Sequence, residues 1–506
     1  MSEINNEETV VSQPQQQQMT QQAMSANQGR LQIICNHFKE IALATLIFAV
    51  FYTFCLYKNL AGITFPLFVG GTFGYLCYCL KTMKIPLKKD AFFYIICSVL
   101  LGISTFCTNS VPIQFFNFVG ILLLIGSFMV HQVYEDSKWD FSKYIGTVLY
   151  TAIVSIAHIL QPFIHMNYYF KNHSKNKGGK GKYVVYGILI AIPLLLIVLT
   201  LLSVADVVFG QMVDWMFQDM VPGDYFGVLF LTIFAFFAAY AFLCAVVSKD
   251  LKEEVADRRV GEPIVAITFT SILTVVYLIF CMIQIMYLFI GGMEMPEGYT
   301  YAGYARQGYF QLLFVCLINL VMVLVCLHRF KEHKVLKVIL TIISGCTYIM
   351  IASSVYRMIL YVNSFCLTFT RVLVLWSLLV LTILLTGIVI NIYKPTFSLF
   401  RFCMIVVTVS YLGLSFSHQD YWITKYNLVS AERYPHFEMD LNYLHHLSAD
   451  KIPAMVAYMD EKQLTEYGED YRGDLYMEGI HAGEDLDFRT FNLSKYIASQ
   501  SVRNLK

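Results

Sequence analysis

Long apolar runs recur along most of the chain and decide what it can fold into. Eleven stretches are long enough to cross a bilayer, which takes about 20 apolar residues in a helix. They cover residues 41–57, 63–80, 91–107, 115–133, 183–204, 225–247, 264–290, 307–327, 335–361, 372–393 and 399–416. A backbone inside hydrocarbon must satisfy its own hydrogen bonds, and these runs are too long for barrel strands. The sequence therefore predicts an all-α polytopic transmembrane bundle.

The overall composition also indicates a bilayer environment. Hydrophobic residues make up 57% of the chain and charged residues 14%, whereas soluble domains carry roughly 25% charge. The formal net charge of +1 provides no basic field with which to hold nucleic acid. The lipid bilayer is therefore the expected partner, and nucleic acid is excluded.

The thirteen cysteines lie almost entirely inside the apolar runs, and none follows Cys403. Cys77 and Cys79 lack the two-residue spacer that metal and redox motifs use. We expect these side chains to pack as small hydrophobic groups, without disulfides in the polar C-terminal region.

The stretch 144–164 is apolar enough to cross but has a distinct polar face. Its polar residues recur at spacings of three and four, at Lys143, Thr147, Thr151, Ser155, His158, Pro162 and His165. The opposite face is apolar, which is the pattern of a helix lying in the membrane surface. We expect an interfacial helix over 144–164, with a twelfth crossing as the alternative.

The charges between the runs favour the interfacial interpretation. The most basic loops are 81–89, 171–182, 249–259, 329–337 and 394–401. If 144–164 does not cross, all five lie on one face, and Lys/Arg-rich short loops mark the cytoplasmic side. On the opposite face, the loop 108–114 is uncharged, and the loops 206–224 and 291–304 carry acidic residues. This arrangement predicts a cytoplasmic N-terminus and an extracytoplasmic C-terminus in a cell membrane.

Both ends of the chain differ in composition from the apolar runs. The Gln-rich stretch 13–22 lies in a tail, residues 1–30, that has too few apolar residues to fold. No cleavable signal peptide is expected, because the first apolar run has no small-residue cleavage site behind it. From Ser417 onward the chain becomes polar, which predicts a small soluble helical domain over 417–506.

Several short motifs resemble a bacterial multi-pass membrane family, domain of unknown function 4173, which is related to 4153. They are Tyr304-Ala305-Arg306-Gln307-Gly308-Tyr309-Phe310, Tyr356-Arg357-Met358 with Leu360-Tyr361, Leu367-Thr368 with Arg371, Lys425-Tyr426-Asn427, Leu441-Asn442-Tyr443-Leu444, Leu447-Ser448-Ala449-Asp450 and Asn492-Leu493-Ser494. The resemblance runs from about residue 183 to 496. The turn Ser364-Phe365-Cys366 departs from it, because similar proteins have smaller, Gly-containing turns there.

The resemblance implies a multi-pass membrane protein and names no activity. Together with the apolar runs it divides the chain into four parts. They are a disordered cytoplasmic tail (1–30), a four-span part with the interfacial helix (31–182), a seven-span family core (183–416) and the extracytoplasmic domain (417–506).

Charged residues near the predicted outer ends of the spans form a candidate polar cluster. Its members are Arg306, Arg357, Arg371, Asp206, Asp214 and Glu294, with Glu297 beside them. Charges beside hydrocarbon usually pair or line a polar cavity. The arginines could bind an anionic headgroup or substrate, since their forked donors suit carboxylate and phosphate. Alternatively, they are interface anchors and interhelical ion pairs.

Polar groups inside the spans are few. Gln284, Asn319 and Asn391 are expected to form interhelical hydrogen bonds, the usual role of amides in membranes. Protease, hydrolase-elbow and P-loop patterns are absent from the sequence, so no catalytic residue is predicted. His418, Asp420, His436, His445 and His446 of the C-terminal region could bind a metal but are expected to be solvated instead, and no cofactor is predicted.

These observations leave three hypotheses for function. The first is a non-enzymatic envelope scaffold or sensor whose bundle presents the C-terminal domain to an envelope protein. The second is a transporter or binder of an anionic lipid or solute that uses the arginine cluster. The third is an intramembrane enzyme.

Overall fold

A computed structural model shows the architecture. It describes residues 31–506 apart from 137–138, 140, 174–186, most of 188–223, 249–258, 287–307, 434–439, 463–467, 485 and 504–506. The chain divides into two compact units. The first comprises residues 1–60, 64–99 and 120–253, and the second comprises 61–63, 100–119 and 254–506.

The described residues form helices, and their only pairing of strand type is an isolated bridge between Gly261 and Phe330. The first part of the chain forms α2 (Phe38–Leu56), α3 (Thr64–Thr82), α4 (Ala91–Cys107), α5 (Val111–Val133), α6 (Phe141–Ala157), α7 (Gln161–His173) and α10 (Asp224–Ser248). A second series is α11 (Pro263–Gln284), α13 (Tyr309–Arg329), α14 (Lys334–Ser364), α15 (Phe369–Tyr393) and α16 (Leu399–Ser415). The C-terminal series is α17 (Gln419–Arg433), α18 (Leu441–His445), η2 (Ala449–Lys451), α19 (Ile452–Lys462), α20 (Gly468–Glu484) and α21 (Leu493–Val502).

Seven described helices are long and apolar enough to cross a membrane, or nine if each of two bent pairs is one span. The seven are α2, α5, α10, α11, α13, α14 and α15, and the bent pairs are α6 with α7 and α16 with α17. The protein is thus an α-helical membrane protein. The expected count of about eleven is not confirmed, because α4 is a shorter apolar helix and 183–204 lies largely outside the described residues.

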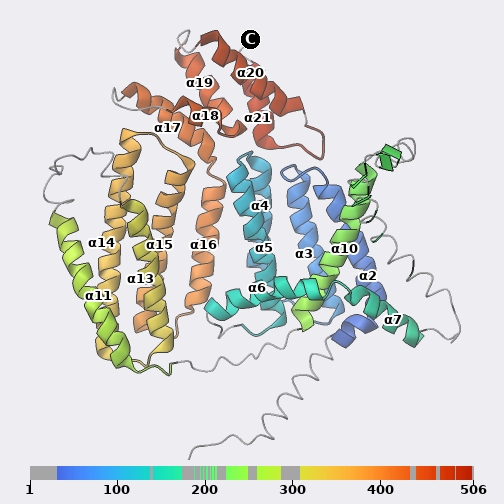
Figure 1. The fold of residues 1–506 in the computed structure, drawn as a ribbon, viewed down its shortest axis with the longest axis horizontal. Helices are drawn as coiled ribbons and strands as arrows, with labels where there is room; N and C mark the ends of the chain where they lie inside the picture. Colours follow the sequence, from blue (N-terminus) through green and yellow to red (C-terminus); the bar gives the residue numbers. More distant parts are fainter. Residues whose placement is uncertain are drawn as a thin grey trace, which may run out of the picture. The chain divides into compact units, whose positions relative to one another are not determined.

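The sequence suggested one straight helix over 144–164, but the structure does not have one. This stretch belongs to α6 and α7, which meet at an angle of 62°. Within this unit, α6 lies across the direction of α2 and α3 (Figure 1). Its polar residues Thr147 and Thr151 are buried in the protein, while Ile153 and Ile156 are exposed. The polar face therefore packs inward rather than toward water, and the interfacial placement stays a prediction.

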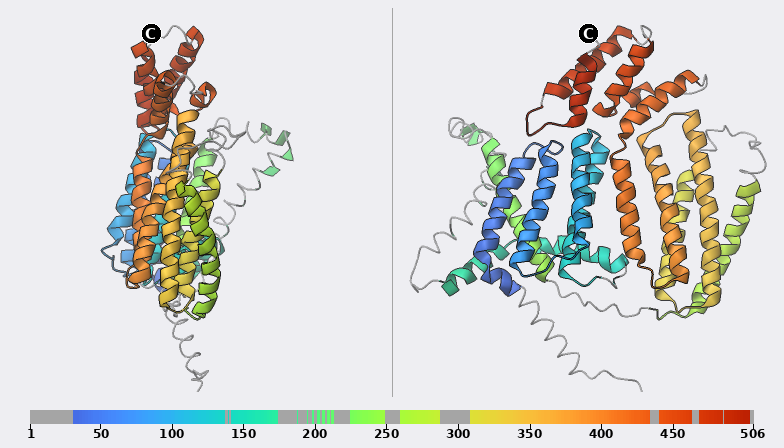
Figure 2. Two further views of the ribbon diagram at one scale, coloured as in Figure 1. Left: turned by 90° about the vertical axis from the view of Figure 1, so that its left-hand side faces the viewer. Right: turned by 180° about the vertical axis from the view of Figure 1, so that it is seen from behind.

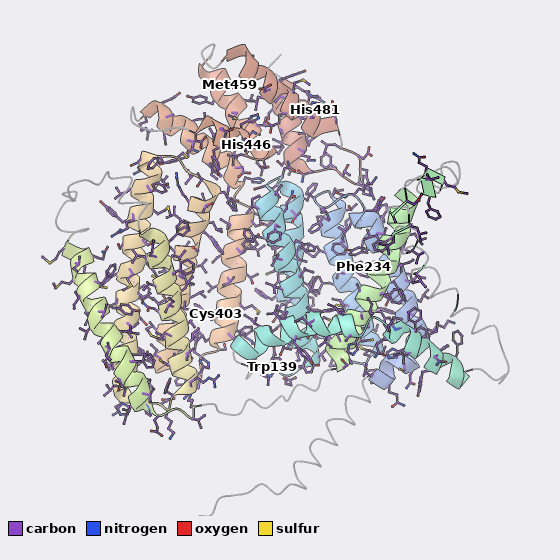
Figure 3. The ribbon with its side chains drawn as sticks, in the orientation of Figure 1. Trp139, Phe234, Cys403, His446, Met459 and His481 are labelled. Atoms are coloured by element: carbon purple, nitrogen blue, oxygen red, sulfur yellow. The ribbon has the colours of Figure 1, made fainter. Side chains whose placement is uncertain are left out.

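Aromatic residues organise the turn between α5 and α6. Trp139, labelled in Figure 3, is buried and lies between the rings of Tyr134 and Tyr144. The Lys143 ammonium lies 4.6 Å from the centre of the Trp139 ring. A cation over an aromatic face is a favourable contact at a membrane surface. The Tyr134 hydroxyl donates to the Val246 carbonyl at 2.5 Å, which fastens the turn to α10.

The spans of the second unit pack around α14, which contacts α11, α13 and α15, while α16 packs against α15 (Figure 2). Buried residues along α14, including Leu340, Met350 and Met358, form the two cores of this bundle. With 31 residues, α14 is about 46 Å long, which exceeds the roughly 30 Å of hydrocarbon. One or both ends of α14 therefore extend beyond the apolar layer.

The C-terminal helices have a core of their own, formed by Leu428, Leu444, Met455, Leu475 and Ala498 with their neighbours. Helices α17, α19 and α21 converge on η2, and α20 packs along α21. Asn492 caps α21, because its side chain accepts a hydrogen bond from the Lys495 N–H at 3.2 Å.

Candidate functional site

The predicted outer cluster is only partly visible. Arg306, Asp214 and Glu294 lie outside the described residues, as does Glu297. Asp206 belongs to the first unit, and its exposed carboxylate accepts a hydrogen bond from the Phe209 N–H at 2.7 Å. The remaining two, Arg357 and Arg371, belong to the second unit and have different environments.

Arg357 is buried and bonded to a residue from the other predicted set. The Gln284 Oε1 atom accepts hydrogen bonds from Ser353 Oγ at 2.6 Å and from Arg357 Nη2 at 3.3 Å. All three side chains are buried between α11 and α14. Hydrogen bonds of this kind between helices are what a charged group beside hydrocarbon requires.

Gly308 accommodates this arginine just before α13. Its φ of +110° is in the region that favours glycine, and a methyl group there would lie 3.1 Å from Arg357 Nη1. The positive φ and the close approach of Arg357 together explain why a glycine occupies position 308.

Arg371 is held in a different way, at the turn between α14 and α15. Its guanidinium lies 4.0 Å from the centre of the Tyr361 ring, and Nη1 donates to Cys366 Sγ at 3.6 Å. The planar guanidinium stacks well on an aromatic face. Tyr361, Cys366 and Arg371 therefore stabilise this turn.

The amides divide between two roles. Asn319 is fully buried and donates to Thr347 Oγ1 at 3.0 Å, an interhelical bond between α13 and α14. Asn391 lies near the C-terminal end of α15, at the opposite end of the bundle from Gln284. There it lines a pocket with Arg259 and Lys337.

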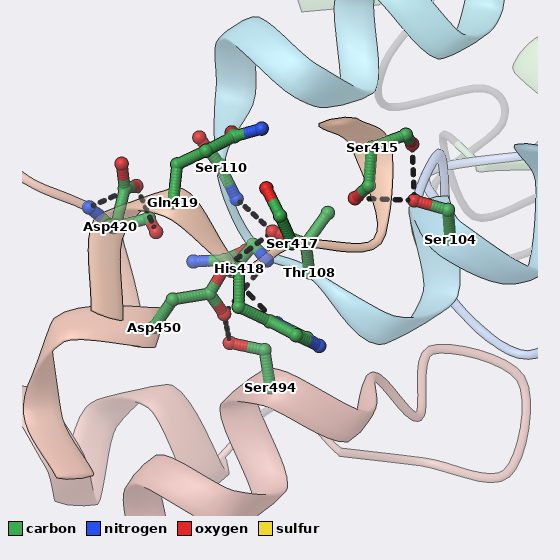
Figure 4. Close-up of polar contacts among 12 residues, drawn as sticks. Ser104, Thr108, Ser110, Ser415, Ser417, His418, Gln419, Asp420, Asp450 and Ser494 are labelled. Carbon is green, nitrogen blue, oxygen red and sulfur yellow. Dashed lines mark hydrogen bonds and ion pairs between the residues drawn. The ribbon is translucent and has the colours of Figure 1, made fainter. Parts of the chain in front are cut away.

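A cluster that sequence reasoning missed surrounds Asp450, and we call it the junction cluster. It comprises Thr108, His418, Asp420, Ser448, Asp450, Asn492 and Ser494, all in the second unit. They come from the α4–α5 turn, the α16–α17 bend, η2 and the start of α21. Figure 4 shows the Asp450 carboxylate among His418, Thr108 and Ser494.

Asp450 is the centre of the junction cluster. Its side chain is 3% exposed. Thr108 Oγ1 donates to Asp450 Oδ2 at 2.5 Å, and Ser494 donates to Oδ1. His418 Nδ1 lies 3.9 Å from Oδ2. A buried carboxylate is tolerated only with such partners, so it holds three separate segments together.

Asn492 strengthens the same junction through the backbone. Besides capping α21, its amide donates to the carbonyls of Ala61 at 2.9 Å and Thr108 at 3.2 Å. The Ile63 N–H donates to the Phe491 carbonyl at 2.9 Å. These bonds join residues that are far apart in the chain.

A second carboxylate, Asp420, is buried at the start of α17 and accepts a hydrogen bond from Ser448 Oγ at 2.6 Å. Burial raises the pKa of Asp420, because the charged form loses solvation. The neighbouring Asp450 carboxylate raises the pKa of His418, whose φ of +46° marks the bend between α16 and α17. Both titratable groups therefore bind protons more tightly in the fold.

The turn between α14 and α15 is fastened to the C-terminal helices as well. Asn427 is buried, accepts a hydrogen bond from the Leu367 N–H at 2.6 Å and donates to the Leu367 carbonyl at 2.9 Å. Tyr443 Oη accepts from the Phe369 N–H at 2.8 Å.

The end of α16 is joined to α4 and α5 by another hydrogen-bond network. Ser415 donates to Asn117 Oδ1 at 2.7 Å, as does Tyr411 at 2.8 Å, and Ser104 donates to the Ser415 carbonyl at 2.9 Å. The end of α16 is thus fixed to α4 and α5 by hydrogen bonds between their side chains and backbone.

The chemistry of the junction cluster is that of a structural joint. The hydroxyls of Ser494 and Thr108 each donate a hydrogen bond to the Asp450 carboxylate. Within the described ranges, no three His, Cys, Asp or Glu side chains are grouped to hold a metal ion.

The sequence did contain a signal for this cluster. Ser448, Asp450, Asn492 and Ser494 all belong to the motifs that carried the family resemblance. The motifs identified the residues, but nothing in them indicated that they meet.

An α-helical multi-pass membrane protein with such a polar joint is the class that the fold defines. The chain belongs to the family described as domain of unknown function 4153, which matches residues 95–458. The assignment to 4173 is not confirmed, although the related family that was expected beside it is the one that matches. No curated protein and no solved structure is significantly similar to the chain.

Proposed function

We propose that the protein is a non-enzymatic scaffold of a bacterial cell membrane, in which the bundle holds the C-terminal helices outside the cytoplasm for partner binding or sensing. The observation that carries the proposal is the junction cluster. Asp450 is buried and joined to Thr108 and Ser494, which belong to different segments of the chain. Ordering these side chains costs conformational entropy, and their hydrogen bonds can offset that cost only while the segments stay together.

The alternative, an anionic-ligand transporter, has less support from the arginines. Arg357 is bonded to Gln284 inside the bundle, and Arg371 stacks on Tyr361. Both arrangements use the guanidinium in contacts within the protein. The described part of the predicted cluster thus favours the structural interpretation of these residues.

The proposal can be tested with a photo-crosslinking residue placed at Met477, which is exposed on α20. In intact cells we expect a discrete adduct with an envelope protein. The same residue at Ile272, exposed on the apolar helix α11, serves as the control and should form no such adduct. In the Asp450→Ala background the Met477 adduct should weaken, because the C-terminal helices lose their attachment.

Two results would contradict the scaffold proposal. One is that no exposed position on α20 or α21 forms an adduct that depends on Asp450. The other is that Arg357→Lys leaves the fold intact but abolishes uptake of an anionic solute, which would favour transport.

A further inference from the structure

Cations gather at one end of the helical bundle in the second unit. The helices alternate in direction, so the starts of α11, α14 and α16 and the ends of α13 and α15 meet there (Figure 2). Among the described residues, the cations of these ends are Arg259, Arg329, Lys331, Lys334, Lys337, Lys394 and Arg401, and the carboxylates are Glu262 and Glu332. The described part of this end therefore has a positive excess.

A pocket opens within this basic end. The space between atoms in this hollow is about 390 Å³, and part of it is open solvent. Its polar lining comes from Arg259, Lys331, Lys337 and Asn391 with neighbouring groups, and its apolar lining includes Leu340. A cationic rim above the apolar ends of membrane spans suits a ligand that has both a charged and an apolar part.

Glu332 positions two of the cations. Its carboxylate accepts hydrogen bonds from Arg259 Nη1 at 2.6 Å and from Lys337 Nζ at 2.7 Å. The bond from Lys337 lowers the pKa of Glu332, so the carboxylate stays charged and keeps both partners in place. Among the side chains that line the pocket, the cations Arg259, Lys331 and Lys337 outnumber the carboxylate of Glu332.

The start of α14 adds to the positive field. His333 caps this helix by accepting a hydrogen bond from the Val335 N–H at 3.2 Å, and it also lines the pocket. The N-terminal end of a long helix carries a partial positive charge that favours anions. The pocket thus combines side-chain cations with a helix terminus.

We propose that this pocket binds the phosphate group of an anionic phospholipid from the adjacent leaflet. Arg259 and Lys337 contact the phosphate, Asn391 donates to a headgroup oxygen, and the acyl chains lie along the outer apolar surface of the spans. Basic pockets between helices at the cytoplasmic surface bind such headgroups through these contacts. The inference does not depend on the scaffold proposal, because none of the C-terminal helices contributes to the pocket.

The test uses the full-length protein purified in neutral detergent and the thermal unfolding midpoint as readout. Phosphatidylglycerol should raise the midpoint of the wild type, whereas phosphatidylcholine should not. In the Arg259→Gln/Lys337→Gln double variant, the apparent affinity for phosphatidylglycerol should fall on the order of thirtyfold, as expected for two interfacial cations.

The matched control is Lys394→Gln/Arg401→Gln, which removes the same charge from the same end without altering the pocket lining. This control should keep the response of the wild type. The conservative Arg259→Lys variant, with an unchanged midpoint in phosphatidylcholine, separates loss of binding from loss of folding.

Inorganic phosphate provides the second arm, because a soluble anion would present the same chemistry. A weak response to phosphate beside a strong response to phosphatidylglycerol supports the lipid. Full stabilisation by phosphate alone would overturn the lipid assignment. Equal responses of the two double variants to phosphatidylglycerol would overturn the pocket itself.

Discussion

Asp450 joins segments whose positions in the chain differ by hundreds of residues. Its Oδ2 atom accepts from Thr108, and its Oδ1 atom accepts from Ser494. Because the carboxylate is 3% exposed, water cannot replace these partners. The residue therefore has an energetic importance that its place in the short helix η2 does not indicate.

Replacing Asp450 should loosen the C-terminal helices. Asp450→Ala leaves the hydroxyls of Thr108 and Ser494 without their acceptor, and we expect a loss of about 2 to 4 kcal/mol. Asp450→Asn keeps one acceptor and should lose less. The measurement is thermal unfolding in detergent, followed by limited proteolysis after residue 417.

The control for this prediction is Asp474→Ala on α20, where the side chain is exposed. It should leave stability within experimental error of the wild type. If Asp450→Ala behaved like Asp474→Ala, the junction cluster would have no structural importance.

His418 should make the stability of the same region depend on pH. Its pKa is raised from 6.5 by the Asp450 carboxylate, whose Oδ2 atom lies 3.9 Å from His418 Nδ1. A raised pKa in the fold means that the stabilisation is complete below the ordinary value and is lost as pH rises through the folded value. Asp420, whose pKa burial raises from 3.8, acts in the same direction at lower pH.

We expect the temperature of the unfolding midpoint to decrease as the pH is raised from about 6 to about 8. His418→Gln should remove most of this slope, since glutamine does not titrate. A slope that persists in His418→Gln, or a midpoint that rises over this interval, would rule out His418 as its source.

At the scale of elements, close helix contacts depend on glycines whose position in the sequence does not reveal them. A methyl group at Gly479 of α20 would lie 2.5 Å from Val502 Cγ1 of α21. The same test at Gly473, also in α20, finds nothing within 4 Å. A side chain at position 479 would thus clash with α21, whereas one at position 473 of the same helix would have free space.

Gly479→Ala should destabilise the C-terminal helices by about 1 to 3 kcal/mol, because the added methyl overpacks the α20–α21 contact. Gly473→Ala should be neutral or should stabilise them by up to about 1 kcal/mol, through higher helix propensity. Urea unfolding monitored by tryptophan fluorescence or circular dichroism compares the two. Stabilisation by both substitutions would show that α20 does not approach α21 closely.

At the scale of the whole molecule, the predicted topology puts the basic loops in the cytoplasm and the C-terminal helices outside it. A cysteine introduced at Asp474 should react with a membrane-impermeant maleimide in intact cells, above the background of the thirteen native cysteines. A cysteine at Lys334 should react only after lysis. The reverse pattern would invert the orientation and transfer the proposed lipid pocket to the outer leaflet.

Much of the membrane architecture could be predicted because hydropathy is a local property. The runs 335–361 and 372–393 correspond closely to α14 and α15. The bend between α6 and α7 could not be predicted, because the apolar run continues through it without a distinctive break. Candidate arginines could be selected from their position near span ends, yet the bond from Arg357 to Gln284 needed the packing of α11 on α14.

The sequence by itself determined that the chain enters a bilayer as helices, since transfer of apolar side chains and backbone hydrogen bonding are decided within each segment. It also carried Asp450, Asn492 and Ser494 as motif residues. Only the tertiary structure decided that they meet Thr108, which is 342 residues from Asp450. Buried polar groups find partners through packing across the chain, and no local pattern encodes that choice.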